Sequence, residues 1–242
     1  MRLLCISDVH GHLDALRAVM ATAERHSFQK LLVAGDIVFP GPEPLETWRR
    51  LVAARAVMVQ GLVDRAVVSL DPDTLTARSD NDRQRLELLR HVRESLGELV
   101  MQRIRHLPTH VRLPLEDGGE LLLVHGSPVD PGEPLTHDMS DEEMMALVGD
   151  DPADVIVCGA SHVPFDRTLE PTRGALRGPA QAPPGLRVVN VGSVGEAPGA
   201  GPRVAHATWI ESTPRGLWIE SSAVPLDDAP RAADEKPCAD AH

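Results

Sequence analysis

The first sixty residues alternate short apolar runs with amphipathic segments. Three apolar runs predict buried strands, at residues 2–7, 30–34 and 57–60. Two segments between them predict helices, at residues 13–26 and 42–54. In the first of these, Leu13, Leu16 and Met20 recur at the spacing of one helix face. Strand–helix–strand–helix–strand at this pace is typical of a parallel sheet covered by helices, so the sequence predicts an α/β fold.

The rest of the chain begins with one long helical segment and continues mainly as short apolar strands. Residues 81–106 have a helical period, and Ser95 followed by Glu98 resembles a capping box, which predicts two helices meeting there. A short helix is predicted at residues 141–148, and further strands at 111–115, 120–124, 155–158, 186–189, 204–210 and 217–220. Two segments are too poor in apolar residues to order themselves, 171–185 and the acidic tail 225–242. We therefore expect one domain over residues 1–224 followed by a disordered tail.

Composition excludes several functional classes. The 242 residues carry a formal net charge of −12, which disfavours binding to nucleic acid or to anionic membranes. The chain has no Tyr and only 3 Trp and 3 Phe, so platforms for stacking single-stranded bases are not expected. Three cysteines are too few for a disulfide framework, and no stretch has the pattern of a signal peptide or a membrane span. We expect a cytoplasmic protein, with its oligomeric state left open.

Polar residues follow the apolar strands at their carboxyl ends. They are Asp8, His10, Asp36, His125 and His162. Because open α/β sheets build sites where strands end, these side chains are expected to converge. Imidazole and carboxylate together suit Mn, Fe, Co, Ni or Zn. Each element alone has a plainer interpretation, such as a solvated turn, a helix cap or a satisfied histidine. Four such elements in order, each directly after a strand, favour shared metal chemistry.

The ordered motifs resemble those of the calcineurin-like metallophosphoesterases, and most closely the small bacterial phosphodiesterase branch. That pattern runs D-x-H, G-D, G-N-[HC]-D, H-G and G-H-[TS]-H. This chain has DVH at residues 8–10, GD at 35–36, GLVD at 61–64, HG at 125–126 and GASH at 159–162. The resemblance covers residues 1–224. It implies a four-layer αββα sandwich of two mixed β-sheets flanked by helices, with the site on their shared edge.

The resemblance also implies a set of metal ligands and a reaction. In the family two divalent ions share a bridging Asp, and a metal-bound hydroxide attacks phosphorus. The first ion would take four residues present here, Asp8, His10, Asp36 and His162. The second would take Asp36 and His125, with an Asn and a further His. Asp36 and His125 would be the catalytic residues, and the substrate a small phosphate ester.

Two ligands of the second ion are missing. Leu62 stands where the family has the Asn, and Ala160 where it has the first His of G-H-[TS]-H. Val63 stands where many relatives have a general-acid His. Because Leu and Ala side chains offer no lone pair, we expect one tightly bound divalent transition metal (Mn, Fe, Ni, Co or Zn), with a second ion weak or absent.

Two functions remain open at this stage. The first is a metal-dependent phosphoesterase, most plausibly acting on phosphodiesters, in which His125 positions the phosphate. The second is a binding or interaction protein of the same fold that has lost or weakened catalysis, with Leu62 and Val63 adding an apolar contact surface. The net charge of −12 disfavours a third hypothesis, a nuclease of the same fold, because an acidic protein repels the nucleic-acid backbone.

Several secondary residues carry weaker expectations. Asp64 is expected either to orient a nearby histidine or to cap the next turn. Asn190 and Ser193 are expected to form turns, and His12 to be a cap or exposed. Four arginines in one helical segment predict a solvated face: Arg83, Arg85, Arg90 and Arg93.

Overall fold

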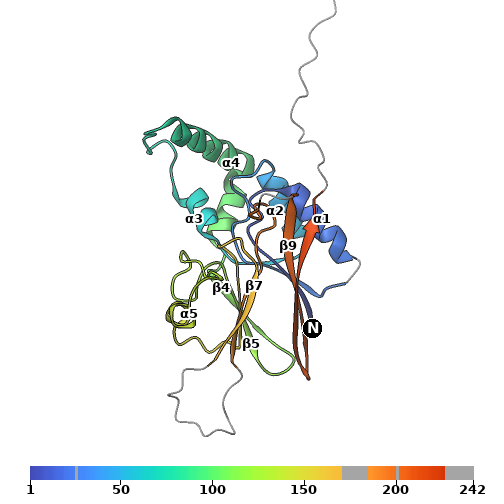
Figure 1. Ribbon diagram of the computed structural model, residues 1–242. Coiled ribbons are helices and arrows are strands. Elements are labelled where there is room, and N and C mark those ends of the chain that lie inside the picture. The colour runs from blue at the N-terminus through green and yellow to red at the C-terminus, as the bar shows by residue number, and fades with distance from the viewer. Residues whose placement is uncertain (25–26, 171–184, 200–201, 227–242) are drawn as a thin grey trace, which may run out of the picture.

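Two five-stranded mixed sheets form the centre of the molecule (Figure 1). The computed structural model describes residues 1–24, 27–170, 185–199 and 202–226. The first sheet has the order β10-β9-β1-β2-β3. Its strands are β1 (Arg2–Ile6), β2 (Lys30–Val33), β3 (Val57–Met58), β9 (Val204–Thr213) and β10 (Gly216–Pro225). The strands β1, β2 and β3 run parallel, with Cys5 opposite Leu32, and β9 joins β1 antiparallel.

The second sheet has the order β4-β5-β6-β8-β7. Its strands are β4 (His110–Pro114), β5 (Glu120–Val124), β6 (Val155–Cys158), β7 (Phe165–Leu169) and β8 (Leu186–Asn190). The central strands β5, β6 and β8 are parallel, and the edge strands β4 and β7 pair antiparallel. The carboxyl ends of β5, β6 and β8 therefore lie at one edge of this sheet.

Both sheets are apolar on both faces, which sets the layer order. Along β1, Leu3 and Cys5 pack between the sheets, whereas Leu4 and Ile6 pack under the helices of the first sheet. Strand β5 alternates in the same way, with its even-numbered residues under the outer helix of the second sheet. Successive side chains of a strand point to opposite faces, so continuous apolar runs are what a sheet covered on both sides requires.

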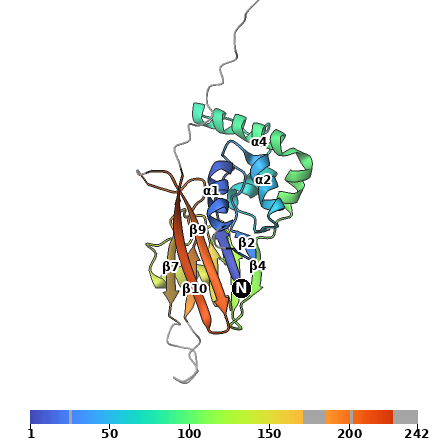
Figure 2. The same cartoon turned by 90° about the vertical axis from the view of Figure 1, so that its right-hand side faces the viewer.

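Helices cover the outer faces of the two sheets. Helices α1 (Leu13–Glu24) and α2 (Pro44–Ala53) lie on the first sheet, and α5 (Asp141–Val148) packs on the second (Figure 1). Helices α3 (Leu62–Ser69) and α4 (Asp80–Arg105) extend the first helical layer beyond the end of the sandwich (Figure 2). The expected four-layer αββα sandwich of two mixed sheets is confirmed.

Most predicted elements occur within a few residues of their expected bounds. The predicted break near Ser95 is a kink inside α4, where Gly97 has the non-helical angles φ 68° and ψ 166°. Helix α3 and strand β7 were not predicted. The last strand reaches Pro225, and Leu226 is buried, so the described fold runs two residues past the expected boundary. Residues 171–184 and 227–242, where mobility was expected, lie outside the described residues.

Candidate metal centre

The five residues expected at the site meet at the edge where the strands end. Backbone hydrogen bonds tie their loops together: Asp8 donates to the Gly35 carbonyl, His10 to that of Asp36, and Gly159 to that of His125. These bonds continue the pairing of β1 with β2 and of β5 with β6 past the last strand residues. The polar side chains are thus positioned by the two sheets themselves.

The first group of candidate ligands is Asp8, His10 and His162. The Nε2 atoms of the two histidines are 3.2 Å apart. Asp8 Oδ1 lies 3.3 Å from His162 Nε2 and 3.8 Å from His10 Nε2. Ligands bound at about 2.1 Å to one ion are separated by distances of this order. These three side chains could therefore hold one divalent metal ion.

The second group is Asp8, Asp36 and His125, all buried. His125 Nε2 lies 3.3 Å from Asp36 Oδ2. Burial by itself would lower the pKa of His125, but the hydrogen bond to Asp36 and the charges of Asp36 and Asp8 raise it to about 9. Burial likewise opposes ionisation of Asp36, but the hydrogen bond to His125, the charges of His125 and His10 and the Val63 N–H together lower its pKa. Asp8 belongs to both groups, whereas the resemblance implies Asp36 as the shared ligand.

Two of the histidines are oriented by backbone carbonyls. His10 Nδ1 lies 2.5 Å from the Phe39 carbonyl oxygen, and His125 Nδ1 lies 2.7 Å from that of Ala34. A carbonyl accepts only, so each Nδ1 carries the proton and each Nε2 faces the site. This is the arrangement in which an imidazole presents its lone pair to a metal.

One carboxylate oxygen at the centre lies near two histidines but makes no hydrogen bond among the described residues. Asp8 is fully buried, and its Oδ2 accepts a 3.0 Å hydrogen bond from the Ala160 N–H. Its Oδ1, which faces His10 and His162, makes no hydrogen bond. A buried, unsatisfied carboxylate oxygen is costly, and a cation would satisfy it. The donor set therefore fits a divalent metal.

The site loops concentrate unusual backbone conformations. Five of the seven described non-glycine residues with positive φ belong to them: Asp8, His10, Asp36, Ala160 and His162, with φ between 51° and 64°. Left-handed conformations of this kind cost free energy in residues with a Cβ and persist where the surroundings impose them. Here they turn consecutive polar side chains toward one point.

Two glycines of the motifs are explained by close approach. A Cβ at Gly61 would overlap the backbone N and Oδ1 of Asp36, and one at Gly159 would overlap Ser7 Oγ and crowd Asp8 Oδ2. Any larger residue would therefore displace a candidate ligand.

Leu62 and Val63 open helix α3 instead of supplying ligands. The Leu62 side chain is 52% exposed. The Val63 N–H donates a 2.7 Å hydrogen bond to Asp36 Oδ1. Ala160 contributes its own N–H to Asp8 in the same way. Val63 and Ala160 thus each bind a carboxylate of the site through the backbone N–H, whereas their side chains supply no ligand atom.

Asp64 acts on the backbone and makes no described hydrogen bond to a histidine. Its Oδ1 accepts from the Ile37 N–H at 2.9 Å and its Oδ2 from the Gly61 N–H at 3.1 Å. The second bond belongs to a capping box in which Gly61 is the N-cap of helix α3 and Asp64 its third residue, so Asp64 contributes to the cap without being the N-cap itself. Burial, together with the charge of Asp36, raises the pKa of Asp64 to about 6.

Two residues near the centre were not recognised from the sequence as site residues. Glu196 Oε2 lies 3.9 Å from His10 Nε2. Asn190 is fully buried and donates to the Gly159 carbonyl and to Ser161 Oγ, so it holds the loop that carries His162. Asn190 is the last residue of β8 and Glu196 lies in the loop that follows it, a region that reaches the site because β8 runs parallel to β6. No local pattern of residues could have shown this.

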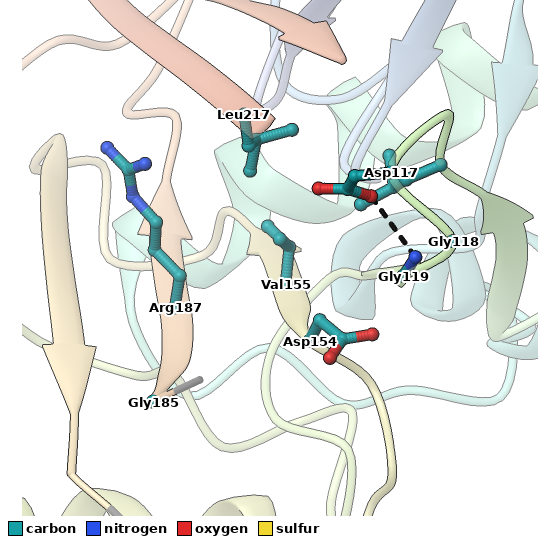
Figure 3. Close-up of a pocket in the computed structure, with 9 residues that line it drawn as sticks. Asp117, Gly118, Gly119, Asp154, Val155, Gly185, Arg187 and Leu217 are labelled. Atoms are coloured by element: carbon teal, nitrogen blue, oxygen red, sulfur yellow. Dashed lines mark hydrogen bonds between the residues drawn. The ribbon is translucent and has the colours of Figure 1, made fainter. Parts of the chain in front are cut away.

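A cavity at the opposite end of the sandwich offers no comparable chemistry (Figure 3). It lies at the amino ends of β6 and β8, where Asp117 accepts a hydrogen bond from the Gly119 N–H. Arg187 is bound to Asp166 through two nitrogens, and Asp154 accepts from the Glu120 N–H. Each charged side chain that lines this cavity already has a protein partner.

A two-sheet sandwich with a cluster of Asp and His at its strand ends is the architecture of a metal-binding hydrolase. The model of the calcineurin-like phosphoesterase superfamily domain matches residues 1–211, and the chain belongs to this family. A metallophosphoesterase from Sphaerobacter thermophilus is similar in structure, with 24% identity and a TM-score of 0.71 over 93% of this chain and 89% of that one. The hypothetical protein PH1004 from Pyrococcus horikoshii OT3 has 21% identity and a TM-score of 0.72, over 94% and 89%.

These likenesses show the fold, and no curated protein matches significantly by sequence. Within the described ranges, no helix combines the length and apolarity needed to cross a membrane.

Proposed function

We propose that the protein is a metal-dependent phosphodiesterase with one well-formed metal site. The observation that carries the proposal is the buried Asp8 Oδ1, which makes no hydrogen bond among the described residues and faces the Nε2 atoms of His10 and His162. These three residues would hold the ion, with Asp36 beside them. Membership of a phosphoesterase family supports the substrate class. Manganese is our first choice of ion, because a mixed imidazole and carboxylate donor set suits it.

The remaining site residues divide the other tasks. Once bound, a divalent ion would lower the pKa of a water molecule and neutralise charge on the phosphoryl oxygens. His125, held at Nδ1 by the Ala34 carbonyl, presents Nε2 to the same space and would position the phosphate. The ion pair between His125 and Asp36 fixes both side chains before substrate arrives.

A second ion would be weak or absent. Asp36 Oδ1 already accepts the Val63 N–H, so Oδ2 is the oxygen that Asp36 has left for a ligand beside His125. Neither Leu62 nor Ala160 adds a donor atom. An ion in the second group would share Asp8 with the first ion and have only Asp36 and His125 besides, so we expect it to be held less tightly.

The proposal is tested by Mn²⁺-supported hydrolysis of bis(4-nitrophenyl) phosphate. Wild type would be compared with Asp36→Ala and with Glu142→Gln, a control on the surface of α5. We expect Asp36→Ala to lose on the order of 10²-fold in rate or more, since it removes a candidate metal ligand and the carboxylate that holds His125. Wild-type turnover no faster than that of Asp36→Ala would contradict the proposal.

A second candidate function is a binding protein that has lost catalysis. The observation that favours it is the exposed Leu62 side chain at the position of a missing ligand. If wild type is inactive and the double variant Leu62→Asn/Ala160→His gains turnover, the chain has kept the architecture without the chemistry. Turnover in wild type above the Asp36→Ala background would exclude this candidate.

A further inference from the structure

A mainly apolar cavity opens directly beside the candidate metal centre. Its volume is about 500 Å³, within the range of small-molecule sites. One end is lined by residues of the centre, among them His10, Asp36 and His162. The rest of the lining comes from the β2–α2 loop, from helices α3 and α4 with the segment between them, and from Glu196. A molecule in this cavity can therefore contact the metal ligands and the apolar wall at once.

The apolar wall follows from the period of helix α3 and its packing on α4. Val63, Val67 and Leu70 recur at i, i+4 and i+7, which places them on one helix face toward the cavity. Leu86 and Leu89 of α4 line the same cavity at a spacing of three. Leu62 and Asp64 do not line the cavity, because they lie on other faces of the helix.

The wall is held in place by the arginines of α4. Arg93 donates to the carbonyls of Val67 and Leu70, at 2.6 and 2.8 Å, and so ties down the end of α3. Arg90 donates to Asp73 and to the Pro72 carbonyl, in the loop that follows. Arg90 is exposed, as expected for a solvated basic face, whereas Arg93 is only partly exposed, and both bind the backbone or side chains of the segment that carries the wall. A wall fixed in this way does not have to be ordered when a ligand binds.

The rim of the cavity leaves apolar surface in water. Leu70 and Leu75 each line it and are each 41% exposed. Arg85 also lines it, and its aliphatic stem can lie along the same surface. Covering such leucines with an apolar ligand is favourable, because their surface is then removed from water.

We propose that this cavity binds a hydrophobic ester group of the substrate, so that the protein prefers phosphodiesters with one bulky alkyl or aryl arm. The inference rests on the proposed function, because the phosphate is what the metal centre would hold. The continuity of the cavity with His10, Asp36 and His162 is what identifies the occupant: it must carry a phosphoryl group at one end and hydrocarbon at the other.

Binding of alkylphosphonates tests the inference without turnover, because their C–P bond is not an ester. Methylphosphonate and butylphosphonate would be titrated calorimetrically into the protein in Mn²⁺. We expect butylphosphonate to bind on the order of tenfold tighter or more, since each buried methylene is worth about fourfold in affinity. In Leu70→Ser/Leu75→Ser this preference should fall several-fold. In Leu99→Ser, a matched change at a 65% exposed leucine of α4 outside the cavity, it should stay at the wild-type value.

Equal affinities for the two phosphonates, no binding of either, or a preference that survives in the double serine variant would each overturn the inference. A parallel assay with methyl and phenyl esters of 4-nitrophenyl phosphate separates it from the proposed function. Turnover of both esters with the same KM means that the protein is a phosphodiesterase whose cavity is not used. A butyl preference lost in the double variant, without turnover of either ester, means that the cavity binds and the proposed catalysis is absent.

Discussion

The backbone N–H of Val63 donates a 2.7 Å hydrogen bond to Oδ1 of Asp36. The bond joins the first turn of α3 to the loop after β2, and it explains how apolar residues can follow β3 at a site built from carboxylates and imidazoles. The first turn of a helix has N–H groups without intrahelical partners, and a carboxylate is their preferred acceptor. Val63 thus serves the site through its backbone, and its side chain lines the adjoining cavity.

Restoring the two missing side chains should create a second metal site. In Leu62→Asn/Ala160→His we expect the Mn²⁺ stoichiometry to rise from one to two ions per chain, because an amide oxygen and an imidazole join Asp36 and His125. Each single variant should stay at one tight ion. Calorimetric titration measures this, and a double variant that still binds one ion would show that these positions do not complete a second site.

Enlarging Gly61 should disturb Asp36. The added methyl group of Gly61→Ala would overlap the Asp36 carboxylate, so we expect weaker Mn²⁺ binding and a loss of about 1–3 kcal/mol in the free energy of unfolding. Gly132→Ala is the matched control, because its Cβ would come no closer than 3.3 Å to any neighbour. Urea denaturation and metal titration of both variants check this. Equal unfolding free energies and equal Mn²⁺ affinities in the two variants would show that Asp36 is not displaced by a methyl group at position 61.

Metal should stabilise the fold through Asp8. At an Mn²⁺ concentration of 100 times the dissociation constant, an ion that binds only the folded state adds about 2.7 kcal/mol to stability. We expect a clear rise in the melting temperature of wild type on adding Mn²⁺, and little or none in Asp8→Asn, whose amide can still accept the Ala160 N–H. The same rise in both proteins would place the ion elsewhere.

The carboxylate of Asp64 should stabilise the fold through its two hydrogen bonds to backbone N–H groups. It is fully buried and accepts two backbone N–H groups, and Asn can replace only one of these acceptors. We expect Asp64→Asn to lower the free energy of unfolding by about 1–3 kcal/mol, the cost of a buried unsatisfied donor. Urea denaturation at pH 7 measures it, and an unchanged midpoint would contradict the assignment.

His206 should make stability fall in mild acid. Burial lowers its pKa below the ordinary 6.5, and its Nδ1 is buried without a hydrogen bond against Gly192. As the pH falls below about 6.5, His206 is protonated in the unfolded chain but stays neutral in the folded one, because its folded pKa is lower. The free energy of unfolding therefore decreases as the pH falls. His206→Gln removes this contribution. We expect the unfolding free energies of the two proteins to differ by a constant above pH 6.5 and to converge or cross below it. Parallel pH profiles would refute this.

The sequence predicts the sheets because their strands are apolar on both faces. Runs such as Leu121–Val124 leave no doubt about burial, and the Pro and Gly between runs mark the connections. Strand β7 was missed because Phe165–Leu169 mixes Asp, Arg and Thr into five residues at a sheet edge. Helix α3 was missed because eight residues give fewer than three turns of period, and its cap is the unusual pairing of Gly61 with Asp64.

The candidate site could be predicted only where its residues directly follow a strand. Asp8, His10, Asp36, His125 and His162 do so, and the structure brings them together. Glu196 and Asn190 depend on β8 lying beside β6, which the linear sequence does not state. The cavity depends on how α3 packs against α4, a relation between two helices whose angle no local pattern encodes. The backbone hydrogen bonds of Val63 and Ala160 to the site carboxylates depend on loop conformation, which the residue types alone do not show.

The stoichiometry of Mn²⁺ binding to wild type tests the central claim most directly. Calorimetric titration, with electron paramagnetic resonance on the same samples, counts tight ions and detects coupling between neighbouring ones. We expect one tight ion per chain with an uncoupled spectrum, and a loss of affinity on the order of 100-fold or more in Asp8→Asn. Two ions of similar affinity with a coupled spectrum would contradict a single-metal centre, and tight binding retained in Asp8→Asn would place that centre elsewhere.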